Sequence, residues 1–177
     1  RVLPINNYIA VTEPLGTDQT AGGLIPGGEG ASDTRFVIYY WRPTPDGRLS
    51  FGGGESYSRA FPDDIAEFVR PHLVRIYPAL KDRRIDYAWG GTLGVTQTRL
   101  PLIRKVRNGV YTITGFSGQG VSMAPFAGKI IAQALIGEPA RFDAFADLPV
   151  PRFPGGRAFR TPLLAAAMTW YALRDRL

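Results

Sequence analysis

The sequence predicts an α+β fold, in which strands and helices fall in largely separate stretches of the chain. Residues 2–13 and 35–52 are rich in β-branched and aromatic side chains, which favour strands. Helical spacing of apolar residues first appears after residue 64, and a second extended stretch follows it. Only residues 110–136 combine a strand, a glycine turn and a helix, whereas a regular α/β protein repeats that unit. We therefore expect a mixed or antiparallel sheet with helices.

The first strands are predicted to form a sheet with a hairpin. Residues 2–13 alternate loosely as a strand and stop at a Pro-Leu-Gly segment. The glycine-rich residues 16–33 are expected to form a loop, with a lid over a ligand as the alternative. Residues 35–42 and 48–52 read as two strands, because the Pro-Thr-Pro-Asp-Gly segment between them has good turn chemistry.

A helix is predicted to follow the Pro-Asp-Asp segment that ends at Asp64. The acidic pair Asp63 and Asp64 suits a helix cap better than an oxygen-ligand metal site. His72 lies on the apolar face of this helix, so we expect it to be structural, and Pro71 should kink or split the helix. The apolar face consists of Ile65, Phe68, Val69, Leu73 and Ile76.

The second half of the chain is predicted to hold an extended segment, a strand–turn–helix unit and a last helix. Residues 85–96 are extended, and residues 110–114 form a short strand that leads into a helix ending near 136. A last helix should begin with Thr161 as its cap. The small residues on one face of the helix before 136 suggest very close packing there; that face holds Ala124, Ala127, Gly128, Ile131, Ala132 and Leu135.

The glycine turn of residues 115–120 is the feature most suggestive of chemistry. Unpaired N–H groups at a helix start favour an anion, and glycines let a ligand approach the backbone. A nucleophile elbow requires glycine at Gln119, and a dinucleotide fingerprint requires glycine at Met123, so neither motif is present. From the residues alone, a ligand-binding turn and a turn that serves packing both remain open.

Composition limits the other classes of function. Of the 177 residues, 45% are apolar, and 21 Lys and Arg against 15 Asp and Glu give a net charge of +6. The longest apolar stretch, residues 162–173, is well short of the roughly 20 residues that a membrane span needs. The sequence contains no cysteine, which excludes disulfides, thiolate zinc sites and a cysteine nucleophile. The basic residues within 81–107 are explained by solvated strand edges, so we expect neither nucleic acid nor a metal as a partner.

Several segments, in this order, resemble the carboxy-terminal half of flavin-dependent amine oxidoreductases of the D-amino-acid-oxidase superfamily. The tail from Phe153 onward (FPGGRAFRTPLLAAAMTWYALRDRL) is similar to the γ-glutamylputrescine oxidase branch of that superfamily. The superfamily-level resemblance rests on the hairpin 39–55 (YYWRPTPDGRLSFGGGE), residues 89–91 (WGG), residues 98–101 (TRLP) and the turn 115–121 (GFSGQGV).

The resemblance implies that different parts of the chain belong to different domains. Residues 1–96 would belong to a substrate-binding domain, residues 97–145 to the end of a Rossmann-like FAD domain, and residues 146–177 to a tail and helix. The amino-terminal Rossmann half would be missing, and the start at Arg1 without a methionine leads us to expect a piece of a longer protein. FAD would be bound by Gly115, Phe116, Ser117, Gly118, Gln119, Gly120 and Val121; the substrate would be bound by Tyr39, Tyr40, Arg42 and Trp89.

Departures from the family pattern refine the expected chemistry. Gln119 takes the place of a common histidine, and the absence of cysteine implies a non-covalent flavin. Sarcosine-oxidase-type relatives have a carboxylate-binding lysine where this chain has Ser122, and the lysine that helps oxygen react is replaced near Ser50. The resemblance therefore implies a cytoplasmic enzyme that oxidises a small amine such as γ-glutamylputrescine. The alternatives are a non-catalytic ligand-binding or assembly subunit and an oxidase of sarcosine or glycine.

Overall fold

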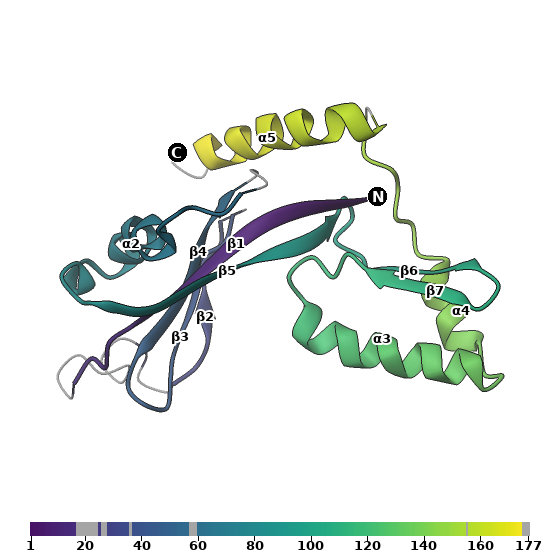
Figure 1. Ribbon diagram of the computed structural model, residues 1–177, viewed down its shortest axis with the longest axis horizontal. Helices are drawn as coiled ribbons and strands as arrows, with labels where there is room; N and C mark the ends of the chain where they lie inside the picture. The colour runs from purple at the N-terminus through teal and green to yellow at the C-terminus, as the bar shows by residue number, and fades with distance from the viewer. Residues whose placement is uncertain (17–24, 26–27, 36, 57–59, 155, 175–177) are drawn as a thin grey trace. The chain divides into compact units, whose positions relative to one another are not determined.

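The computed structural model describes residues 1–16, 25, 28–35, 37–56, 60–154 and 156–174, and it has the predicted α+β architecture (Figure 1). Its chain divides into two compact units. The sheet unit comprises Asn6–Gly91 and Ala165–Leu177, and the hairpin unit comprises Arg1–Ile5 and Thr92–Leu164. The domain boundaries predicted after residues 96 and 145 stay predictions.

The sheet unit is built on five strands in the order β2–β3–β4–β1–β5 (Figure 1). The pairings of β1 with β4, β4 with β3 and β3 with β2 are antiparallel. The strands are β1 (Val2–Thr12), β2 (Ala31–Ser32), β3 (Tyr40–Pro43), β4 (Leu49–Ser56) and β5 (Ile85–Thr96).

Strand β3 starts five residues later than its sequence predicts. The carboxylate Oδ1 of Asp33 accepts hydrogen bonds from the backbone N–H of Tyr39, at 2.9 Å, and of Arg35, at 3.3 Å. This side chain closes a loop that competes with strand pairing, as short polar side chains often do. Most of the predicted loop 16–33 lies outside the described residues.

Helix α2 (Ile65–Ile76) packs against one face of this sheet and closes the main core. Asp64 caps it by accepting a hydrogen bond from the N–H of Glu67, as predicted. Of the two outcomes expected for Pro71, a kink or a split, the split does not occur: α2 continues through the proline, because Val69 and Leu73 anchor both sides of it in the core. The buried core consists of Tyr8, Ala10, Leu15, Tyr39, Leu49, Phe51, Val69, Leu73 and Leu80.

The hairpin unit has a smaller core of its own, formed by an antiparallel hairpin and two helices. The hairpin consists of β6 (Leu102–Arg107) and β7 (Val110–Thr114), and the helices are α3 (Gly120–Leu135) and α4 (Ala140–Ala146). β6 and α4 were not predicted; the charged residues of β6 hide its buried Ile103. The core consists of Ile103, Ala127, Ile130 and Phe142.

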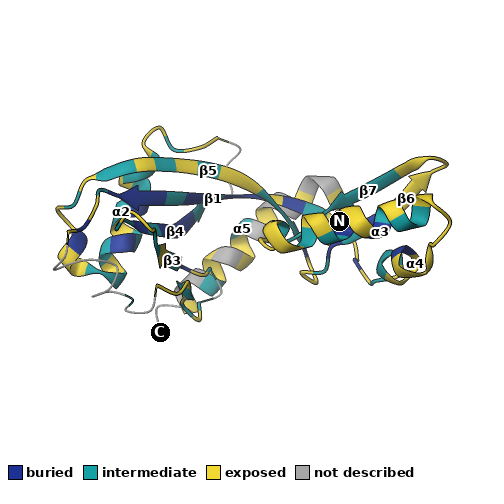
Figure 2. Ribbon diagram, turned by 90° about the horizontal axis from the view of Figure 1, so that it is seen from below, coloured by how far each residue is buried: buried dark blue, intermediate teal, exposed yellow. Residues whose placement is uncertain are grey.

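The face of α3 that packs within this unit overlaps the predicted small-residue face only in part, at Ala127 and Ile131. Ala127 and Ile130 are fully buried, whereas Ala124, Gly128, Ala132 and Leu135 are exposed. Figure 2 shows exposed stretches along α3. The helix is apolar on more than one side, so its own unit buries only one of its apolar faces.

The last helix, α5 (Gly156–Arg174), starts earlier than predicted and contains Pro162 in its second turn. No helix within the described part of the chain is long and apolar enough to cross a membrane.

Candidate functional site

The turn between β7 and α3 has the backbone conformation that its glycines suggest. Gly115, Ser117 and Gly118 have φ values of 74°, 53° and 94°, all in the region that side chains with a Cβ disfavour. Ser117 is the one residue of the three that has a Cβ, so it alone is strained by a positive φ. A turn of this kind reverses the chain sharply and starts α3 at Gly120.

The first half of the turn is fastened to the end of β5. The N–H of Ser117 donates to the carbonyl of Gly94 at 2.9 Å, and the N–H of Thr96 donates to Oγ of Ser117 at 3.3 Å. Oγ of Ser117 also donates to the carbonyl of Gly115 at 3.2 Å. A Cβ on the buried Gly115 would lie 2.6 Å from Cγ2 of Thr96, so only glycine fits there. These contacts hold Ser117 in its strained conformation.

The second half of the turn is presented outward. Gln119, the N-cap residue of α3, makes no capping hydrogen bond with its side chain. A Cβ on Gly118 would meet no atom within 4 Å, and Val121 is 95% exposed. The first N–H groups of a 16-residue helix therefore face open space with the positive end of the helix dipole. This arrangement can stabilise negative charge on a group that approaches Gly118.

The seven residues predicted to bind a cofactor thus fall into two groups. Gly115, Phe116 and Ser117 anchor the turn, and Phe116 also packs on the core of the hairpin unit. Gly118, Gln119 and Val121 are exposed, and Gly120 is half-buried at the first position of α3. The outward group leaves room for a ligand.

The residues predicted to bind substrate lie on both faces of the sheet. Tyr39 is 7% exposed, belongs to the core beneath α2, and shares a hydrogen bond of 2.7 Å between its hydroxyl and Nδ1 of His72. Tyr40 and Arg42 point to the opposite face, because adjacent strand residues alternate. A Cβ at Gly90 would contact Tyr8 and Phe61 on the core side, so the neighbouring Trp89 also points away from α2. Tyr39 therefore cannot line the same surface as the other three residues.

We call the face opposite α2 the open face, defined by Asn7, Tyr40, Arg42, Ser50 and Glu55. The hydroxyl of Tyr40 donates to Oδ1 of Asn7 at 2.7 Å, and its ring covers Gly52. Burial of the phenol, and then the negative charge of Glu55, raise the pKa of Tyr40 above its usual value. The sequence analysis did not single out Asn7 or Glu55, because the face on which each lies depends on strand pairing, which no local pattern reveals.

A bulge in β4 explains why Glu55 reaches this face. Asn7 pairs with Glu55 and Ile9 pairs with Gly52, so β4 has one more residue than β1 over this interval. The extra residue lies at Gly53-Gly54, where Gly54 has a φ of 75°. Hypothetical Cβ atoms on both glycines would touch core rings, of Tyr39 and Phe51 at Gly53 and of Phe68 and His72 at Gly54. The alternation of faces is therefore shifted by one residue beyond the bulge.

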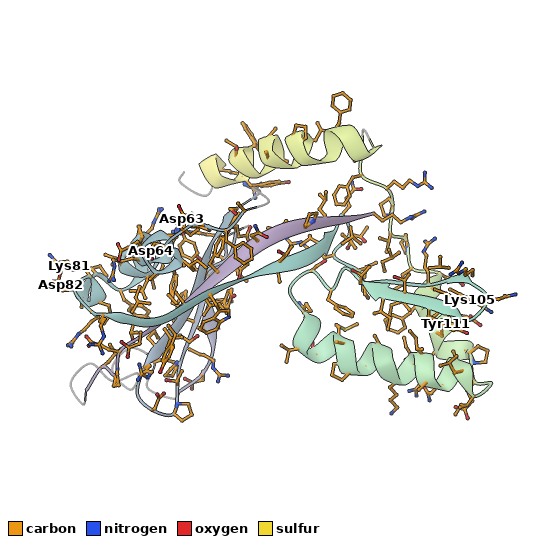
Figure 3. The ribbon with its side chains drawn as sticks, viewed as in Figure 1. Asp63, Asp64, Lys81, Asp82, Lys105 and Tyr111 are labelled. Atoms are coloured by element: carbon orange, nitrogen blue, oxygen red, sulfur yellow. The ribbon has the colours of Figure 1, made fainter. Side chains whose placement is uncertain are left out.

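Charged residues outside the open face are distributed over both units. Figure 3 shows Asp63 and Asp64 at the start of α2, Lys81 and Asp82 in the turn before β5, and Lys105 opposite Tyr111 on the β6–β7 hairpin. Lys81 and Lys105 belong to different units. No group of three or more metal-binding side chains is found among the residues that the structure describes.

Comparison with protein families and curated proteins gives consistent matches. A family model described as FAD dependent oxidoreductase matches residues 1–134. The chain is 45% identical over 175 residues to "Probable oxidoreductase OrdL" of Rhizobium meliloti (strain 1021), covering 99% of this chain and 40% of that protein. It is 41% identical over 177 residues to "Gamma-glutamylputrescine oxidoreductase" of Escherichia coli (strain K12), covering 100% of this chain and 41% of that protein. The chain thus spans about two fifths of the length of these curated relatives.

Solved structures share the fold. The L-proline dehydrogenase from P. horikoshii matches with a TM-score of 0.59 and 25% identity, over 81% of this chain and 41% of that chain. The glycine oxidase from Geobacillus kaustophilus matches with a TM-score of 0.63 and 17% identity, over 87% of this chain and 40% of that chain. At 17% identity, the second match is informative about the fold alone.

Proposed function

This chain belongs to the family of FAD-dependent oxidoreductases, and on that premise we propose that it is the carboxy-terminal part of an FAD-dependent enzyme that oxidises an amine. The observation that carries the proposal is the turn 115–121, whose outward half leaves a helix N-terminus uncapped and a glycine open to a ligand. We assign this turn to the flavin ring.

The residues of the turn suit that cofactor. When bound, FAD supplies the acceptor for the hydride that leaves the carbon bearing the amine. The reduced ring carries negative charge, which the N–H groups at the start of α3 and the helix dipole would stabilise. Gly118 would allow the ring to approach the backbone, and the anchored Ser117 would keep the N–H groups oriented.

The rest of the FAD site is assigned to a Rossmann-type amino-terminal portion. Support comes from α3, which exposes a stripe of small and apolar residues next to its buried face. Small residues allow close approach of another element, and the exposed Leu135 and Ile136 offer apolar area for it. This reading also accounts for the chain spanning two fifths of its relatives.

The favoured substrate is a γ-glutamylated diamine, and the open face of the sheet unit is assigned to bind it. The name of the 41%-identical relative supports this substrate class. Ser122, whose hydroxyl donates to the carbonyl of Gln119 at 3.2 Å, is uncharged and offers no counter-ion for the carboxylate of an α-amino acid. An amine without a carboxylate beside the reacting carbon fits this position better.

The proposal is tested by Gly118→Ala in the full-length protein, with Gly109→Ala as the matched control. Both glycines have positive φ values, 94° and 73°, and at both a Cβ would meet nothing within 4 Å. Each substitution should therefore cost a similar backbone strain of about 1–2 kcal/mol. Gly109 lies in the β6–β7 turn, away from the helix start.

We expect Gly118→Ala to lose flavin absorbance after purification and Gly109→Ala to retain it. Equal flavin content in both variants would contradict the assignment of the turn to FAD. A wild-type full-length protein that folds but never acquires flavin would instead favour a non-catalytic ligand-binding or assembly subunit. Efficient turnover of sarcosine or glycine in place of a γ-glutamylated diamine would favour the amino-acid oxidase alternative.

A further inference from the structure

The strand register arranges the open face in three rows. Gly52 on β4 pairs with Tyr40 on β3 and with Ile9 on β1, and these three residues form the central row. Arg42 and Ser50 lie two residues further along their strands in the row on one side. Asn7 and Glu55 form the row on the other side. The ring of Tyr40, lying over Gly52, therefore separates a cationic row from an anionic row.

The two charges lie at a defined spacing. One two-residue step along a strand covers about 6.6 Å, so the rows of Arg42 and Glu55 are about 13 Å apart along the sheet. Both side chains are long and flexible, which lets their charged ends move closer together. The surface between them is the aromatic face of Tyr40 and the aliphatic side chain of Ile9.

The environments of the two charges suit opposite ligand groups. Glu55 is half-buried beside the hydrogen-bonded pair of Tyr40 and Asn7, and its negative charge adds to the effect of burial in raising the pKa of Tyr40. A carboxylate next to an aromatic ring is a favourable site for an alkylammonium ion. Arg42 is exposed, and its guanidinium can bind a carboxylate with two parallel hydrogen bonds.

We propose that the open face recognises a zwitterionic ligand whose ammonium group binds beside Glu55, whose carboxylate binds Arg42, and whose apolar spacer crosses the ring of Tyr40. The inference rests on the proposed function in taking this face as the substrate face. It goes further by naming two specificity-determining residues, which would select amines whose reacting carbon is distant from their carboxylate over simple diamines and over amino acids that are oxidised at the α-carbon.

The test uses ligands that carry one or both charges on the same six-carbon chain: ε-aminocaproate, caproate and hexylamine. Their binding to the full-length protein is measured by calorimetry, which does not require turnover. The wild-type protein should bind ε-aminocaproate about tenfold more tightly than either singly charged ligand, since each charge-assisted contact is worth at least that factor.

Two charge-neutralising variants should split this preference. Glu55→Gln should weaken ε-aminocaproate and hexylamine about tenfold and leave caproate unchanged. Arg42→Gln should weaken ε-aminocaproate and caproate by a similar factor and leave hexylamine unchanged. Arg107→Gln, which removes an exposed charge from β6, is the control and should change none of the three.

The proposal is overturned if the wild type binds the three ligands equally, or if each variant weakens all three alike. Equal binding of the three ligands is measured on the wild-type protein, so the proposal can still be refuted if a variant fails to fold. Flavin content is recorded in the same samples. Loss of the binding preference with flavin retained would refute this inference alone, whereas absence of flavin with the preference intact would refute the proposed function.

Discussion

Substituting Gly54 by alanine tests the bulge that turns Glu55 toward the open face. The new methyl group would lie 2.7 Å from Cε1 of Phe68 and 3.0 Å from Cδ2 and Nε2 of His72. Phe68 has little freedom to retreat, because its ring packs edge-on against Tyr8 with centroids 5.0 Å apart. The substitution therefore meets a steric obstacle in addition to its backbone strain.

The two costs of Gly54→Ala can be estimated separately. A left-handed backbone, with φ of 75°, costs a residue with a Cβ about 1–2 kcal/mol. Forcing a methyl group into a packed core costs about 1–3 kcal/mol more. Gly47→Ala is the matched control, because Gly47 has a φ of 79° in the same unit and its Cβ would meet nothing within 4 Å.

Urea-induced unfolding of the full-length protein separates these contributions. We expect Gly47→Ala to lower the free energy of unfolding by about 1–2 kcal/mol and Gly54→Ala to lower it by about 2–5 kcal/mol. The difference measures the contact with Phe68 and His72. Equal losses in the two variants would refute the packing that we describe around Gly54.

Three further predictions concern single side chains. His72 is half-buried, and burial together with the nearby charges of Arg35 and Arg75 lowers its pKa, so the unfolded chain binds a proton at this side chain more readily than the folded chain. The free energy of unfolding should thus fall as the pH drops below about 6.5, the ordinary value for histidine, and His72→Gln should abolish that slope in urea titrations repeated across this range. Asp64→Ala removes the cap of α2 and should lower the free energy of unfolding by about 1 kcal/mol, whereas the neighbouring Asp63→Ala should change it by less than half of that. Ser117→Ala deletes the bonds to Thr96 and Gly115 and should increase the rate of flavin release in a dilution assay; an unchanged rate would contradict the anchoring role of Ser117.

The local spacing of apolar residues was sufficient to predict the helices and strands whose apolar residues are the ones buried in the core. β1, β7 and α2 follow from apolar spacing, and the cap at Asp64 follows from residue type. β3 was predicted too long, because the strand propensity of residues 35–39 competes with the side chain of Asp33, which closes a loop there. β6 was missed because three of its six residues are basic and only Ile103 is fully buried.

The sequence predicts the part of the site in which backbone conformation requires a particular residue type. It does not predict the part in which strand register determines the face on which a side chain lies. Gly115 and Gly118 announce a turn with positive φ, and the structure has it. No local signal separates Tyr39 from Tyr40, although one lies in the core and the other on the open face. Glu55 follows a bulge, and its face depends on pairing with Asn7, which is distant in the chain.

The bulge in β4 also changes which kinds of mutation this strand can tolerate. In a regular strand, two side chains share a face when their positions differ by an even number, yet Gly52 and Glu55 share the open face although their positions differ by three. Deleting one glycine between them would restore an even separation and leave the carboxylate where it is. A substitution that straightened the strand at full length would instead turn the carboxylate toward the aromatic core. In this segment, a change in length would therefore disturb the position of the Glu55 carboxylate less than a change in residue identity.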